Sequence, residues 1–247
     1  GDVNNDGTPD VGFRTSANSF INSNSKDYDS LYVITLNKNG SIKNLYPLIP
    51  GISGFDYEGE RESGWGGYGA GIINMGDMDE NGVNDFLISS PEEKLNDDID
   101  GAFFVLFMNP NGSVKKFHIV DKSEIANNRD VDYFAYSMAS IGDLDKDGIN
   151  EVAVNTNKLF FKDSPDTAEG GVVFFNDSLD TAEWGGLYIL FFNSDGTLKK
   201  STLSTFLSFD QIEPLSFSGY NSGTFAIENA GDLDSNGVND VLIDHFG

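Results

Sequence analysis

Four copies of one acidic phrase constrain the fold of this chain more than any other feature. The copies begin at Gly1, Gly76, Gly142 and Gly231. Counted from the Asp that follows this first Gly, every copy has oxygen-bearing side chains at positions 1, 3, 5 and 9 and a Gly at position 6. Self-similarity of this kind indicates a protein built from repeated supersecondary units.

A second phrase recurs between the acidic copies and predicts a β-hairpin in each repeat. It occupies residues 37–43, 109–115 and 193–199, and each copy has Asn-Gly or Asp-Gly after an apolar run. Gly takes the positive φ that tight hairpin turns require, so the phrase is typical of a turn between two antiparallel strands.

These signals predict four kinds of strand. The strands that enter an acidic loop are expected at 68–75, 134–141 and 225–230, and those that leave one at 11–13, 86–89, 151–154 and 241–243. The strands before the hairpin turn are expected at 31–36, 102–108 and 187–192, and those after it at 41–48, 113–120 and 197–203. One brief helical turn is expected near 123–127.

The strand count predicts an all-β protein with four-stranded antiparallel blades, as in a β-propeller. The successive units hold three, four, four and two strands, with approximate bounds 1–66, 67–132, 133–219 and 220–247. Closed propellers have about four to eight blades. We therefore expect a single propeller segment, an arc of about three to four blades that belongs to a larger propeller or is completed by another segment.

The acidic loops predict four calcium sites. Alternate side chains of a tightly turning loop point toward one centre, the glycine permits the bend, and the seventh residue offers its carbonyl to a hard cation. Calcium is favoured over magnesium, which demands stricter octahedral geometry. The expected ligands are Asp2, Asn4, Asp6, Thr8 and Asp10; Asp77, Asp79, Asn81, Val83 and Asp85; Asp143, Asp145, Asp147, Ile149 and Glu151; and Asp232, Asp234, Asn236, Val238 and Asp240.

Two other interpretations of the loops are weaker. An EF-hand needs a bidentate Glu at position 12, where this chain has the apolar residues Phe13, Ile88, Val154 and Ile243. Ordinary Asp, Asn and Gly turns between strands are common. Four copies that each fill all four side-chain positions with oxygen ligands favour the metal sites over plain turns.

With these loops the sequence resembles the FG-GAP repeats of the integrin α-subunit β-propeller and its bacterial relatives. The matching pieces are Tyr68-Gly-Ala-Gly and Phe134-Ala-Tyr-Ser before acidic loops, and Ser89-Ser-Pro91 after one. The sequence departs from the pattern at Gly223-Thr224, Asn155-Thr-Asn157 and Asp244-His-Phe246. The resemblance implies a seven-bladed fold with structural calcium on the face opposite the usual ligand face.

Composition limits the possible partners and the compartment. The 247 residues include 40 acidic and 15 basic side chains, with a net charge of −25 and no cysteine. Such a surface repels nucleic acid and anionic membranes, and the apolar runs are too short to cross a bilayer. Stability must come from packing or bound ions. No leader is visible at Gly1, so we expect no export signal or a mature or trimmed segment.

No catalytic constellation is recognisable. His118 and His245 are expected to serve packing or the surface, and Glu58, Glu60, Glu62 and Asp98 lack a distinguishing context.

Trp65 and Trp184 share a Trp-Gly-Gly phrase that suits either blade packing or a platform for sugar rings. The polar segments 18–29, 50–64 and 158–180 are either specificity loops or plain surface loops. The sequons at Asn39 and Asn111 coincide with hairpin turns, and a third is at Asn176.

The function that these features favour is that of an extracellular, secreted, calcium-binding recognition or adhesion module. Its partner would be an extracellular protein or glycan, or neighbouring segments of the same assembly. A propeller-fold polysaccharide lyase or hydrolase is one alternative, and a purely structural repeat of a surface appendage is another.

Overall fold

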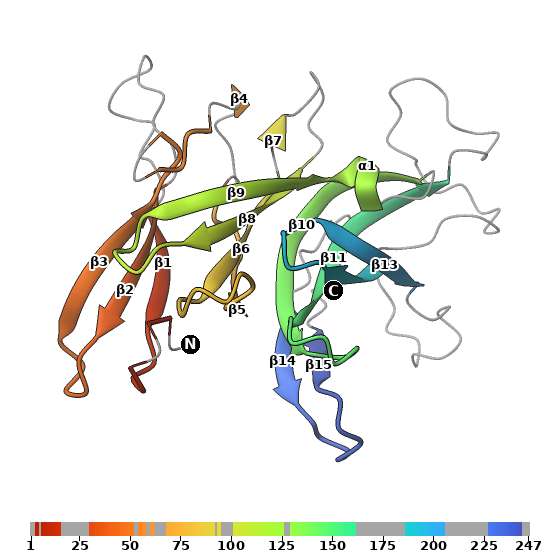
Figure 1. Cartoon of the computed structure of the whole chain (residues 1–247). Coiled ribbons are helices and arrows are strands. Elements are labelled where there is room, and N and C mark those ends of the chain that lie inside the picture. Colours follow the sequence, from red (N-terminus) through yellow and green to blue (C-terminus); the bar gives the residue numbers. More distant parts are fainter. Residues whose placement is uncertain are drawn as a thin grey trace, which may run out of the picture.

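The computed structural model describes residues 3–4, 6–15, 30–51, 54–57, 60–61, 68–91, 93–94, 101–125, 129–161, 186–205 and 227–243. These residues form four main antiparallel sheets that follow one another in chain order (Figure 1), with three, four, four and two strands, and a further two-stranded sheet. The predicted all-β character and strand counts are confirmed. Among the described residues, no helix has the length and apolar character of a membrane span.

Each of the main sheets is a simple meander in which neighbours in sequence pair in space. The first sheet contains β1 (Val11–Thr15), β2 (Ser30–Leu36) and β3 (Ile42–Leu48). The second contains β5 (Ile72–Gly76), β6 (Asp85–Ser90), β8 (Ala102–Met108) and β9 (Val114–Asp121). The third contains β10 (Arg129–Gly142), β11 (Glu151–Phe161), β12 (Gly186–Phe192) and β13 (Leu198–Thr205). The fourth contains β14 (Ile227–Gly231) and β15 (Asp240–Ile243).

The three predicted hairpin turns are confirmed. In each, the glycine N–H donates to the carbonyl of the residue three before it, at 2.8–2.9 Å, and the glycine φ is between 80° and 90°. The side chains of Asn39 and Asn111 accept hydrogen bonds from the backbone and hydroxyl of Ser41 and Ser113, respectively. These two asparagines therefore serve the turns. The short helix α1 (Lys122–Ile125) overlaps the helical turn expected near 123–127.

Several predicted boundaries are wrong; β10, for example, begins at Arg129 and not at Phe134. The strand expected from Tyr68 begins instead at Ile72, because Gly69 has φ +81° and residues 68–70 form a turn. The segment from Lys158, expected to be loop, continues β11 to Phe161, because it pairs with residues 129–132 of a longer β10. Within 50–64, Glu60–Arg61 forms the two-residue strand β4, which pairs with β7 (Glu93–Lys94).

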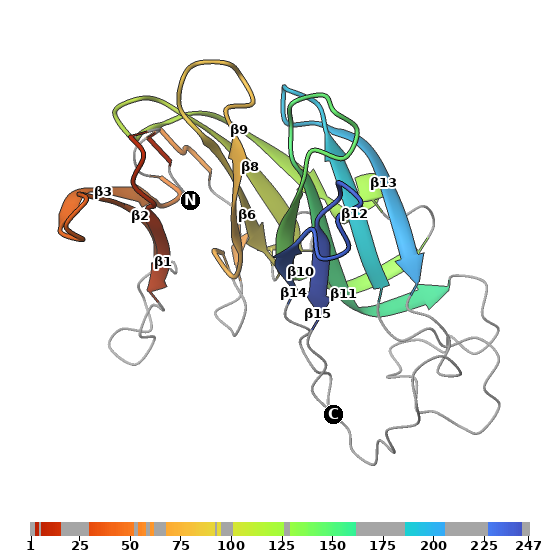
Figure 2. The same ribbon diagram turned by 90° about the horizontal axis from the view of Figure 1, so that it is seen from below.

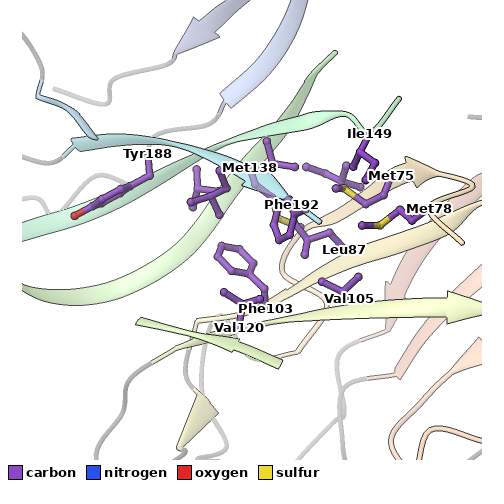
Figure 3. Close-up of a cluster of buried hydrophobic side chains, with 14 of the residues drawn as sticks. Met75, Met78, Leu87, Phe103, Val105, Val120, Met138, Ile149, Tyr188 and Phe192 are labelled. Atoms are coloured by element: carbon purple, nitrogen blue, oxygen red, sulfur yellow. The ribbon is translucent and has the colours of Figure 1, made fainter. Parts of the chain in front are cut away.

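The core consists of layers between successive sheets, and β8 shows how they are made. Alternate side chains of a strand point to opposite faces. Phe104, Leu106 and Met108 therefore face the first sheet, whereas Phe103, Val105 and Phe107 face the third. Figure 3 shows Phe103 and Val105 in this second layer. All seven residues of β8 are buried, which explains why its sequence is a continuous apolar run.

The same stacking continues toward the C-terminus. Val152 and Val154 of β11 pack toward the second sheet, and Ala153 between them packs against Ile227 of the fourth sheet. Figure 2 shows the sheets fanned out along the chain, each one covering the next. This arrangement is consistent with successive blades of a β-propeller.

Candidate metal centres

Each acidic loop described in full joins the first two strands of a sheet. The loops connect β5 to β6, β10 to β11 and β14 to β15, and a fourth precedes β1. The loops after β5 and β10 lie on the same side of the molecule (Figure 2). In a meander, this loop and the hairpin turn between the third and fourth strands lie at the same end of the sheet, so side chains from that turn can reach the loop.

The loops bring together the carboxylates that the sequence predicts as ligands. In three loops, one ligand oxygen from each of the predicted acidic residues lies within 4.8 Å of the others. The groups are Asp77, Asp79 and Asp85; Asp143, Asp145, Asp147 and Glu151; and Asp232, Asp234 and Asp240. Like charges at this distance repel one another unless a cation holds them. In the first loop, Asp2 lies outside the described residues.

The carboxylate at position 1 shapes the turn of each fully described loop. Asp77 accepts hydrogen bonds from the backbone N–H groups of Asn81 and Gly82 at 2.8 and 2.7 Å. Asp143 and Asp232 make the same pair of bonds in their own loops. The side chain at position 5 then accepts the N–H of the residue two further on, at 2.8–3.0 Å in all four loops.

The carboxylate at position 9 anchors the loop to the sheet. Asp85 accepts the N–H of Met78, within the loop, and the N–H of Met108, at the end of β8, both at 2.9 Å. Asp10 makes the equivalent bonds with Val3 and Leu36. In these two loops, position 9 therefore joins the loop to the strand that precedes the hairpin turn, a role that the sequence pattern did not indicate.

Burial gives two of these carboxyls unusual properties. Asp85 is fully buried, and burial raises the pKa of its carboxyl to about 6 despite the two N–H donors. Burial likewise raises the pKa of Glu151. Glu151 is 1% exposed, and its Oε1 is a buried atom without a hydrogen-bond partner, while Oε2 accepts the N–H of Leu144. A buried carboxylate oxygen without a donor is costly unless a cation approaches it.

Position 4 of the loop, which the sequence analysis missed, adopts a left-handed backbone. Glu80, Lys146 and Ser235 have φ of 56°, 63° and 60°. Such a φ is uncommon for residues other than Gly and costs about 1–2 kcal/mol. Three equivalent residues share the conformation, so the bend belongs to the loop design.

Lysines near the loops were also missed. Lys43, Lys115 and Lys199, from β3, β9 and β13, place Nζ at 2.7–2.9 Å from loop carboxylates. Each lies three residues after its turn glycine. That recurrence was visible in the sequence, but its meaning depends on the meander that brings the turn beside the loop.

Most of the other candidate residues from the sequence lie outside the part of the chain that the structure describes. Trp65, Trp184, His245, Glu58, Glu62, Asp98 and Asn176 lie outside the described residues, as do residues 18–29 and 162–180. Glu60 lies in β4, but its side chain is not described. His118 lies on β9, paired with Val105, and its buried Nε2 has no hydrogen-bond partner. The predicted carbonyl ligands Thr8, Val83, Ile149 and Val238 lie at the expected places in the loops, but their coordination stays a prediction.

Comparison with known proteins gives a similarity over part of the chain. Part of the chain is similar to integrin alpha-2 from Bos taurus. The two are 28% identical over 156 residues, which make up 62% of this chain and 12% of the integrin subunit. No family model matches the chain. The chain thus corresponds to a small part of that relative.

The residues of the loops suit a hard divalent cation. Every side-chain donor at positions 1, 3, 5 and 9 is an oxygen, three loops gather their carboxylates, and Glu151 has a buried oxygen without a donor. The acidic clusters are therefore compatible with calcium binding.

Proposed function

We propose that this chain is an FG-GAP-type β-propeller segment whose acidic loops bind structural calcium, and that it serves as an extracellular recognition or adhesion module. The observation that carries the calcium proposal is the buried Oε1 of Glu151, which lacks a donor and belongs to a group of four carboxylates within 4.8 Å. The similarity to an integrin subunit supports the adhesion role and the extracellular location.

In this proposal each loop would hold one cation through the side chains at positions 1, 3, 5 and 9 and the carbonyl of position 7. The cation would offset the repulsion between carboxylates and satisfy the buried oxygen of Glu151. Held in this way, the loop would fix the first two strands of each sheet relative to the third.

The exposed face of the first sheet supports a larger propeller. Val11, Phe13 and Leu45 are 49%, 37% and 51% exposed, and they lie on the face away from the second sheet. Ile34 shares that face and stands six residues before its turn glycine; Leu106 and Leu190, at the same offset, are fully buried against the preceding sheet. We propose that another blade covers this face in the assembled protein.

Calcium binding is tested by thermal unfolding in EDTA, in magnesium and in calcium. A ligand at 100 times its dissociation constant stabilises a protein by about 2.7 kcal/mol, and we expect calcium to raise the melting temperature by about 5 °C or more. Calorimetric titration of Asp79→Ala should show one calcium site fewer than titration of the unchanged protein. The matched variant Glu80→Gln removes a charge from the same loop but no predicted ligand, and it should retain all sites. Melting that calcium does not change would refute the proposal.

The recognition role is tested with the calcium-loaded protein on glycan and peptide arrays, with release of reducing ends followed in parallel. Binding without turnover supports a recognition module. Turnover would instead support the polysaccharide-active enzyme. If neither binding nor turnover is detected, the structural repeat is the alternative that remains.

A further inference from the structure

A lysine ammonium accompanies the acidic loop of each of the first three sheets. Lys115 Nζ lies 2.8 Å from Asp79 Oδ2, and Lys43 Nζ lies 2.7 Å from Asp6 Oδ2. Lys199 Nζ contacts two carboxylates, with distances of 2.8 Å to Asp145 and 2.9 Å to Asp147. All three lysines contact side chains at positions 3 or 5 of their loop.

The meander of the sheet brings about these contacts. Lysine and carboxylate are 36 or 37 residues apart in the first two sheets and at least 52 apart in the third, where the chain between them is longer. The contact survives the insertion because the hairpin turn and the acidic loop lie at the same end of the sheet. A chance surface pair would not recur in this way.

The neighbouring lysines show that the position is specific. Lys116 and Lys200 follow Lys115 and Lys199 directly, so alternation along the strand turns them to the opposite face. Their ammonium groups lie 3.9 Å from the ring centroids of Phe107 and Phe191. Of each adjacent pair, one lysine therefore serves the loop and the other packs on an aromatic ring.

Lys115 contacts only one of the two carboxylate oxygens of Asp79. Its ammonium binds Oδ2, while Oδ1 of the same carboxylate is buried without a hydrogen-bond partner. An ammonium is not a metal ligand, but its charge draws the carboxylates together and opposes a second positive charge a few ångströms away. The same lysine thus favours the folded loop without a divalent cation and disfavours cation binding.

We propose that Lys43, Lys115 and Lys199 are built-in counter-cations that keep three acidic loops folded when divalent cation is scarce and lower the calcium affinity of those loops. The proposal rests on the proposed calcium function for its second half only. These lysines would thus set how strongly the three loops depend on calcium.

The experiment compares Lys115→Met with Lys116→Met, a matched loss of charge one residue away, and with Lys115→Arg, which retains the charge. Hydrogen exchange of the peptide spanning residues 76–85 reports on this loop alone, because its amides at Asn81 and Gly82 donate to Asp77. In EDTA, Lys115→Met should exchange these amides faster than Lys116→Met, while Lys115→Arg should resemble the unchanged protein. In a calcium titration, protection in Lys115→Met should develop at a concentration about three- to tenfold lower than in Lys116→Met.

Equal exchange of the two methionine variants in EDTA would overturn the first half of the proposal. Calcium affinity in Lys115→Met that equals or falls below that of Lys116→Met would overturn the second half. If the unchanged protein does not respond to calcium, the proposed calcium function fails and the second half fails with it. The comparison in EDTA then still decides the first half.

Discussion

At the scale of single residues, Asp85 combines two tasks that the sequence pattern does not separate. Its carboxylate belongs to a predicted metal site, and it also joins the loop to β8 through the N–H groups of Met78 and Met108. The second task needs no metal. It can therefore be measured in the presence of EDTA.

We expect Asp85→Ala to lower the free energy of unfolding by about 2–4 kcal/mol in EDTA, because two buried N–H groups lose their acceptor. Urea denaturation measures this loss. Asp56, which is exposed, provides the control, since Asp56→Ala should change stability by no more than about 0.5 kcal/mol. A loss in Asp85→Ala as small as that of the control would contradict the anchoring role.

The raised pKa of Asp85 predicts a pH dependence with a definite sign. The folded-state pKa of about 6 lies above the ordinary value of 3.8, so the folded protein binds this proton more tightly than the unfolded chain. Its stabilising contribution is present below about pH 4 and is lost as the pH rises through 6.

In EDTA, the melting temperature of the unchanged protein should therefore fall between pH 4.5 and 7 more steeply than that of Asp85→Asn. The pKa values of Asp6, Asp147 and Asp195 are lowered, so these groups titrate below this window. Parallel profiles for the two proteins would show that Asp85 does not titrate there.

At the scale of elements, the turn glycines Gly112 and Gly196 lie close to side chains of the preceding sheet. A Cβ added to Gly112 would lie 1.8 Å from Cδ1 of Tyr46, a β3 residue, whereas one added to Gly40 would meet no atom within 4 Å. Both glycines have φ of +80°. The two positions therefore share their backbone strain and differ in their contact with a neighbouring sheet.

We expect Gly40→Ala to destabilise the protein by about 1 kcal/mol through its positive φ. Gly112→Ala should cost about 1–3 kcal/mol more, because Tyr46 must move. Chemical denaturation of both variants measures the difference. Equal losses would mean that Tyr46 moves aside freely and that the turn does not lock the first two sheets together.

The strands and turns could be predicted from sequence because the information for each is local. Alternation, apolar runs and Asn-Gly or Asp-Gly pairs located β2, β8 and the three hairpins. The extension of β10 and β11 and the pairing of β4 with β7 could not be located, since both depend on which distant segment lies opposite. For the same reason, the loop spacing identified the carboxylates but not the lysines or the backbone partners of position 9.

At the scale of the whole molecule, the first sheet has one apolar face exposed, whereas β8 of the second sheet is buried on both faces. Leu106 is fully buried between two sheets, whereas Ile34, at the equivalent position, is only partly buried. We expect Leu106→Ala to lower the free energy of unfolding by about 2–5 kcal/mol and Ile34→Ala to lower it by about 1 kcal/mol. Urea denaturation over a range of protein concentrations checks both values. A cost at Ile34 that matches Leu106 and falls on dilution would show that a second copy covers this face in solution.

The two-sided burial of β8 also affects the order of events during synthesis. The first sheet precedes β8 in the chain and can cover Phe104, Leu106 and Met108 as soon as they emerge from the ribosome. Phe103, Val105 and Phe107 pack against the third sheet, whose last strand ends at Thr205. Until those residues are translated, an uncharged, phenylalanine-rich strand has one bare face, which is the kind of segment that aggregates. A nascent chain of this protein would therefore expose this apolar face until the third sheet is complete.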